Sequence, residues 1–224
     1  MNIKLQNQYI QLELKNKDKF LRNEIDIDTQ WNKPIFGITL QIELNDLVKT
    51  NIEAYQKNLT ALEQNNLLIL TRKYHHISFQ QVVFWGDIYE KSNEDTWNTV
   101  ACAFTQSFKA QDNICQSFQI TFSKLIATTG GIIWCAYDDH DEMNTLRNTL
   151  QKELPFPKGT TKQNYIIHTT VARFRHKLHD PLKVMNFINN SNESQTMLVD
   201  NINLCKERIY PSLQRKTIAT IRLI

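Results

Sequence analysis

The sequence predicts an α+β fold built from two related lobes that face one another. Two observations lead to this prediction. The chain contains two successive strand–helix–strand units, and the closing strand of each unit carries the same short pattern, a histidine followed two positions later by serine or threonine. A weak internal repeat of this kind is typical of two structurally equivalent halves. The two copies of the pattern begin at His76 and at His168.

The first unit is expected to begin with a strand over residues 36–44, where apolar and polar residues alternate as in a half-buried strand. A helix is predicted from Asn45 to Gln64, because apolar residues recur there at spacings of three or four and so share one helix face. The closing strand is expected to run from Leu67 through His76 toward Phe84.

The second unit repeats this order. Residues 131–137 are almost all apolar, which predicts a buried strand. The acidic run 138–142 favours a helix start in solvent, since carboxylates are stabilised near the positive end of the helix dipole. Pro155 and Pro157 are expected to end that helix. The closing strand is predicted over residues 164–174, with His168 inside it.

The rest of the chain is less patterned. Residues 1–33 are interpreted as an N-terminal extension that packs on the lobes, and residues 34–224 as one bilobal domain. Within the extension, the alternation of Ile10, Leu12 and Leu14 suggests a short strand. Residues 89–95 and 189–195 are predicted to be loops.

Composition narrows the class of protein. An apolar content of 41% is enough for a packed core, and no apolar run is long enough to span a bilayer. The four cysteines are scattered without a C-x-x-C pair, so they indicate neither a zinc site nor a redox pair. The net charge of +3 permits a nucleotide ligand without predicting strong duplex binding. We expect a cytoplasmic monomer without cofactor or metal and without membrane contact.

The repeated motif has a definite chemistry. Side chains alternate along a strand, so His76 and Ser78 share one face, as do His168 and Thr170. Two such strands facing each other offer one neutral imidazole as a base and one protonated imidazole as an acid, because the histidine pKa is about 6.5. The hydroxyls are suited to donate to the non-bridging oxygens of a phosphate. This set of groups suits the cleavage of a phosphodiester without a metal.

These motifs resemble those of the 2H phosphoesterase superfamily, which includes 2′-5′ RNA ligase-like and cyclic phosphodiesterase proteins. The resemblance rests on His76-Ile77-Ser78-Phe79 with the downstream Gly86, and on His168-Thr169-Thr170-Val171-Ala172-Arg173-Phe174. Residues 118–134 are similar to the middle strands of that family, and residues 199–204 and 217–223 to its last two strands. The resemblance covers residues 34–224. The segment between Ser78 and Gly86 is slightly longer than usual, which indicates a bulge.

The resemblance implies two pseudo-symmetric, mainly antiparallel sheets with helices outside and an active cleft between them. It implies His76 and His168 as the catalytic acid–base pair, and Ser78 and Thr170 as substrate-binding groups. The expected function is metal-independent hydrolysis of 2′,3′-cyclic phosphates or RNA-type phosphodiesters, with reversible RNA 2′-5′ ligation left open. Two alternatives remain: a hydrolase of short or cyclic oligonucleotide signals, and a non-catalytic nucleotide-binding module.

The sequence supports two further substrate-binding candidates less directly. Tyr74 has the parity of His76 and is expected at the edge of the cleft. Strand alternation points the side chain of Arg173 away from the cleft that holds His168 and Thr170. A bulge in the strand would turn it toward the cleft. The resemblance is the reason to keep Arg173 as a candidate.

Other residues have weaker claims. His75 is expected on the opposite face from His76, and His140 in solvent at a helix start. The aromatic residues considered for stacking on a base are Trp85, Tyr137 and Tyr210, although ordinary core packing is the stronger expectation for each.

Overall fold

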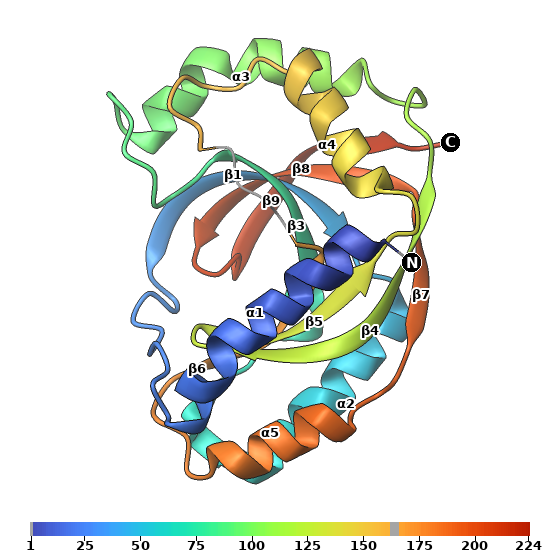
Figure 1. Ribbon diagram of the computed structural model, residues 1–224. Coiled ribbons are helices and arrows are strands. Elements are labelled where there is room, and N and C mark those ends of the chain that lie inside the picture. Colours follow the sequence, from blue (N-terminus) through green and yellow to red (C-terminus); the bar gives the residue numbers. More distant parts are fainter. Residues whose placement is uncertain (1, 162–165) are drawn as a thin grey trace.

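The computed structural model describes residues 2–161 and 166–224, which form five α-helices and two β-sheets (Figure 1). The helices are α1 (Ile3–Leu21), α2 (Asp46–Glu63), α3 (Asn93–Lys109), α4 (Glu142–Glu153) and α5 (Pro181–Asn190). The strands are β1 (Pro34–Glu43), β2 (Leu67–Leu68), β3 (His76–Val83), β4 (Phe118–Thr128), β5 (Gly131–Tyr137), β6 (His168–Phe174), β7 (Gln195–Val199), β8 (Asn201–Ile209) and β9 (Gln214–Arg222). Among the described residues, no helix has the length and apolar character needed to cross a membrane.

Every strand pairing in the two sheets is antiparallel. One sheet has four strands in the order β3-β1-β8-β9, and the other has five in the order β2-β6-β5-β4-β7. Helices α3 and α4 lie at one end of the molecule and α2 and α5 at the other, outside the sheets (Figure 1). The predicted α+β fold of two antiparallel lobes with external helices is confirmed.

The helix of each repeated unit packs on the lobe of the other unit. Helix α2 follows β1 of the four-stranded sheet, yet it packs on β6 and β7 of the five-stranded sheet, which the chain joins next at β2. Helix α4 connects β5 to β6 but lies against β3, where Gln151 Nε2 donates to Gln80 Oε1 at 3.0 Å. This exchange ties the two lobes together by contacts between segments that are distant in sequence.

A bulge interrupts both motif strands at the same relative position. In β3 the register passes from Ser78 to Gln80, so Phe79 is the extra residue. In β6 it passes from Thr170 to Ala172, so Val171 is the extra residue. An extra residue of this kind leaves the regular ladder and bends the strand. The bulge expected between Ser78 and Gly86 is therefore confirmed, and β6 carries its counterpart.

Buried side chains from the exchanged helices satisfy the carbonyl groups at both bulges. Arg147 of α4 donates from Nε to the carbonyl of Phe79 at 2.8 Å, and its guanidinium lies 5.4 Å from the centre of the Phe79 ring. Gln56 of α2 donates from Nε2 to the carbonyl of Val171 at 2.9 Å and to that of Leu70 at 3.1 Å. Both side chains are buried.

The N-terminal residues form a helix, so the strand suggested by Ile10, Leu12 and Leu14 is wrong. The alternation was misleading because Ile10 and Leu14 are exposed. The buried positions of α1 recur at helical spacing instead: Leu5, Tyr9, Asn16 and Phe20.

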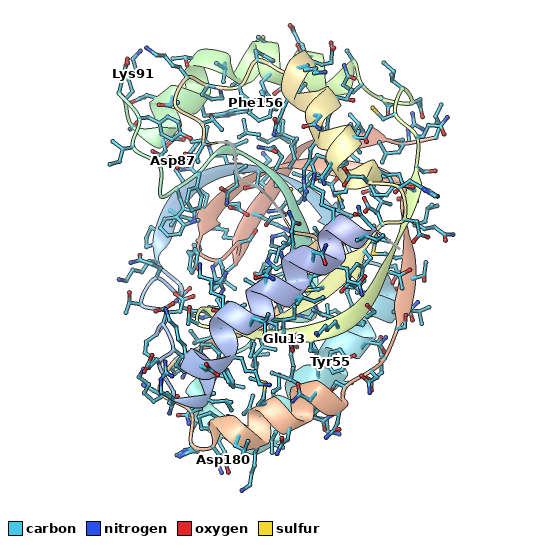
Figure 2. All side chains as sticks on the ribbon, viewed as in Figure 1. Glu13, Tyr55, Asp87, Lys91, Phe156 and Asp180 are labelled. Carbon is cyan, nitrogen blue, oxygen red and sulfur yellow. The ribbon has the colours of Figure 1, made fainter. Side chains whose placement is uncertain are left out.

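Helix α1 packs along β4 and β5. The hydroxyl of Tyr9 lies 2.7 Å from the carbonyl oxygens of both Ala136 and Ile167. Glu13, labelled on α1 in Figure 2, pairs with Lys124 of β4.

The expected single strand from Leu67 to Phe84 is divided. Leu67 and Leu68 pair with β6 in the five-stranded sheet, a short 3-10 turn follows at Arg72–Tyr74, and β3 begins at His76 in the other sheet. The chain crosses here from one lobe to the other. The predicted strand 164–174 begins at His168 in the structure; residues 164 and 165 lie outside the described residues.

The remaining differences concern helix boundaries. Helix α4 begins only at Glu142, and Asp138 is not in solvent but buried, where it accepts a hydrogen bond from the backbone nitrogen of Met143 at 2.8 Å. Helices α3 and α5 were not predicted. They shorten the expected loops, since α3 already begins at Asn93 and α5 extends to Asn190.

Replacing Gln56 by leucine is expected to lower the free energy of unfolding by about 1–3 kcal/mol, because the buried carbonyl of Val171 then loses its side-chain donor. Urea unfolding of the two proteins measures the difference. Lys57→Ala, at the exposed neighbouring position of α2, is the matched control and should change stability by less than about 0.5 kcal/mol. Equal losses in both variants would contradict this role for Gln56.

Candidate active site

The two motif strands belong to different sheets, and the fold brings them together. Strands β3 and β6 contact one another. A cavity of about 290 Å³, here called the central cavity, is lined by His76 and Ser78 from β3 and by His168 and Thr170 from β6. All four side chains are half-buried. The structure therefore places the four residues of the two motifs around one space.

The two imidazoles are oriented in the same way. The Nδ1 atom of His76 lies 2.7 Å from the carbonyl oxygen of Tyr74, and Nδ1 of His168 lies 3.4 Å from that of Ile166. A carbonyl oxygen only accepts, so Nδ1 carries the hydrogen in each ring and Nε2 keeps a lone pair. Ser78 Oγ lies 3.4 Å from Nε2 of His76. Each ring thus has the tautomer that a general base requires.

Burial keeps both imidazoles neutral. It lowers the pKa of His76 to about 3, and the positive charge of Arg215 acts in the same direction. It lowers the pKa of His168 to about 4, with Arg173 and Arg147 adding to the effect. A bound phosphate reverses part of this shift, because a nearby negative charge favours the protonated imidazole.

Arg173 lines the central cavity beside Thr170, so the simple parity argument that pointed it away is wrong. The bulge at Val171 is the reason, because one extra residue returns the following side chains to the face of His168. Asp28 and Tyr210 contact the guanidinium of Arg173. Its Nη1 lies 3.5 Å from Asp28 Oδ2, and the group lies 5.3 Å from the centre of the Tyr210 ring. Gln81 lines the cavity at the equivalent position of β3.

Tyr74 is not among the described residues that line the central cavity. It ends the 3-10 turn before β3, so strand parity does not apply to it. Its ring lies under Lys73 Nζ, 4.7 Å from the ring centre. The carbonyl of Tyr74 is the part that serves the site, as the acceptor for His76.

Aromatic side chains form one wall of the central cavity. Trp85 and Tyr210 both line it, with ring centres 5.1 Å apart in an edge-to-face arrangement, and Phe84 joins them. Tyr137, the third aromatic candidate, packs instead edge-on against Tyr9 at 4.9 Å. The wall offers flat apolar surfaces of the kind on which a base stacks.

A buried carboxyl group that the sequence did not predict also lines the central cavity. Glu207 lines it and is buried; its Oε1 accepts from Gln41 Nε2 at 2.6 Å and its Oε2 from Thr39 Oγ1 at 3.3 Å. Burial raises the pKa of Glu207. Arg215 donates to Gln41 Oε1 at 3.0 Å and so joins the same group. Thr39 and Gln41 were visible as the polar positions of an alternating strand, a face normally assigned to solvent.

The other histidines considered lie outside the cavity. His75 is buried on the opposite face from His76, with Nε2 3.1 Å from the carbonyl of Leu70, as expected from its parity. His140 is exposed near the start of α4. Among residues 2–161 and 166–224, no group of three or more histidine, cysteine, aspartate or glutamate side chains is arranged to hold a metal ion.

No protein-family model and no curated protein matches this sequence. Solved structures do match. The conserved protein of unknown function ATU0111 from Agrobacterium tumefaciens is 10% identical with a TM-score of 0.63, covering 90% of this chain and 97% of that chain. TT0787 of Thermus thermophilus is 11% identical, with a TM-score of 0.57 and coverage of 84% and 97%. E. coli LigT in its apo form is 9% identical, with a TM-score of 0.55 and coverage of 85% and 98%.

At this level of identity the comparisons establish the fold. LigT and TT0787 share the two-lobed arrangement of this chain over almost their whole length, so the fold expected from the motif resemblance is confirmed. The matched structures are covered almost completely, whereas 84–90% of this chain is covered. This chain therefore has residues in addition to the shared fold.

Stability is expected to fall as the pH is lowered below about 6.5. The pKa values of His76 and His168 in the folded protein are depressed, so between about pH 4 and 6.5 the unfolded chain binds more protons than the folded one. The free energy of unfolding should then decrease by up to about 1.4 kcal/mol per pH unit for each histidine. Urea unfolding across this pH range measures the slope.

The double variant His76→Gln/His168→Gln tests whether these two histidines cause the pH dependence of stability. It should show a smaller pH dependence than the wild type, while the contribution of buried His75, whose pKa is also lowered by burial, remains. Equal slopes in the two proteins would show that these histidines are not the groups responsible.

Proposed function

We propose that this protein is a metal-independent phosphoesterase that hydrolyses 2′,3′-cyclic phosphates or RNA-type phosphodiesters. The observation that carries the proposal is the pair of neutral imidazoles, His76 and His168, which line one cavity from two different sheets with a hydroxyl beside each. LigT, which has the same fold, was crystallised with 3′-AMP, a nucleotide with a phosphate at the ribose 3′ position.

The reaction needs one base and one acid on opposite sides of the phosphorus. One neutral imidazole takes a proton from the attacking water through Nε2, and the other, protonated in the presence of the anionic substrate, gives its proton to the leaving ribose oxygen. The bond from phosphorus to water oxygen forms as the bond to the 2′ or 3′ oxygen breaks. The same two proton transfers give ligation when the hydroxyl of a second RNA end attacks the phosphorus in place of water, and the roles of the two histidines exchange when that ligation runs in reverse.

The remaining groups of the cavity have roles consistent with this reaction. The hydroxyls of Ser78 and Thr170 donate to the non-bridging oxygens, and Arg173 adds positive charge where negative charge develops. Trp85 and Tyr210 hold the nucleoside by stacking. Binding without any turnover is the behaviour expected of the alternative, a nucleotide-binding module.

Replacing either His76 or His168 by alanine is expected to lower the turnover of a 2′,3′-cyclic nucleotide by about 10²–10⁴-fold, because each removes a positioned proton-transfer group. The rates are measured with EDTA present, with circular dichroism to show that each variant is folded. His140→Ala, which changes an exposed histidine away from the cavity, is the control and should keep the wild-type rate. Full activity in either cavity variant, or loss of wild-type activity with EDTA, would exclude the mechanism.

Replacing Thr170 by valine, which is close to isosteric, is expected to lower kcat by about 10²-fold, since one donor to the developing charge is removed. Ser78→Ala should have an effect of similar size. The matched variant Thr170→Ser retains the hydroxyl and is expected to recover most of the rate. A Thr170→Val enzyme as fast as Thr170→Ser would mean that the hydroxyl does not contact the phosphate.

A further inference from the structure

A second cavity lies directly beside the central one. It has a volume of about 530 Å³ and shares His168, Thr170 and Arg173 with the central cavity, so the two cavities adjoin at these residues and are together called the cleft. Its far wall is helix α1 and its floor is the turn between β4 and β5. We call it the α1 cavity.

One face of α1 supplies the wall of the α1 cavity. Leu12, Lys15, Asn16 and Lys19 all line it, and their spacing of three and four residues puts them on a single helix face. Asn16 is buried and fixes this face to the turn, because its Oδ1 accepts a hydrogen bond from the backbone nitrogen of Thr129 at 3.0 Å. The two lysines are exposed but extend from a rigidly docked segment.

The α1 cavity is positively charged. Lys15, Lys19 and Arg173 line it, and no carboxylate lines it among the described residues. Arg173 pairs with Asp28, whose Oδ2 lies 3.5 Å from Arg173 Nη1. Within residues 2–161 and 166–224, neither lysine has an ion-pair partner. The two ammonium groups are therefore available to an anionic ligand.

The cleft is different at its two ends. The aromatic wall of Trp85 and Tyr210 belongs to the central cavity, the lysines belong to the α1 cavity, and the shared residues His168, Thr170 and Arg173 lie between them. A nucleoside with a single reacting phosphate uses the aromatic end and the shared residues. The two lysines at the basic end then remain available to bind a second phosphate.

We propose that Lys15 and Lys19 bind the phosphate next to the reacting one, so that the preferred substrate carries a second phosphate on the 5′ side of the reacting nucleotide, as the end of an RNA strand does, and is not a nucleoside 2′,3′-cyclic phosphate alone. The proposal rests on the phosphodiesterase function given above and names its substrate class. It also gives the N-terminal segment a role in the site, since both lysines and Asp28 come from residues 1–33.

The test compares three substrates that end in the same uridine 2′,3′-cyclic phosphate: the nucleoside form, the same nucleotide with a 5′-phosphate, and a dinucleotide. Wild type is expected to show a kcat/KM about tenfold or more higher for the dinucleotide than for the nucleoside form. In Lys15→Ala/Lys19→Ala this ratio should fall by about tenfold, as loss of phosphate contacts predicts. Lys17→Ala, an exposed lysine of α1 that does not line the cavity, is the control and should keep the ratio.

Three outcomes would overturn the proposal while leaving the phosphodiesterase function intact. The first is equal kcat/KM for the nucleoside form and the dinucleotide in the wild type. The second is an unchanged ratio in the double lysine variant. The third is a 5′-phosphorylated mononucleotide that reacts no faster than the nucleoside form, because it carries the same second phosphate as the dinucleotide.

If no substrate turns over, the phosphoesterase function itself is excluded. A binding measurement then still tests whether the two lysines bind a second phosphate. The probe is a fluorescent 2′-O-methyl tetranucleotide with a 3′-phosphate, followed by anisotropy at several salt concentrations. The double lysine variant is expected to bind about tenfold more weakly than Lys17→Ala and with a smaller dependence on salt. Equal affinity and equal salt dependence in the two variants would overturn the inference.

Discussion

The structure depends on the two bulges in the motif strands and on the side chains that satisfy them. The carbonyls of Phe79 and Val171 are displaced from their ladders, and each accepts a hydrogen bond from a buried side chain, Arg147 or Gln56, on a helix of the other unit. A buried carbonyl without a donor destabilises a fold by about 1–3 kcal/mol. Each bulge is therefore stabilised by a helix of the other unit, and these contacts hold together the two lobes that carry the histidines.

The same bulges determine what the cleft contains. Without the extra residue at Val171, strand alternation would turn Arg173 away from His168 and Thr170. With it, a permanent positive charge lies between the central cavity and the α1 cavity. Asp28, from the N-terminal segment, pairs with this guanidinium from behind. A local irregularity of one strand thus connects the motif chemistry to the N-terminal segment.

Burial gives the site its electrostatic character. Both imidazoles have a depressed pKa, and the buried carboxyl of Glu207 has a raised one, so desolvation acts on all three groups toward the neutral form. Arg173 lines the central cavity, and the positive charges of Arg215 and Arg173 also lower the pKa of His76 and His168 respectively. Guanidinium groups in these positions favour the binding of a phosphate.

The sequence by itself determined the local elements around the two motifs and the chemistry of the motifs. Alternation and helical spacing are properties of neighbouring residues, so the strands around His76 and His168, the helix 46–63 and the pairing of each histidine with a hydroxyl were readable in advance. Only the tertiary structure decided the rest. It decided the exchange of helices, the burial of the polar face of β1 and the placement of Lys15 and Lys19 beside His168. These features depend on contacts between residues that are more than a hundred positions apart or lie on opposite lobes. Such contacts leave no periodic signal in one sequence.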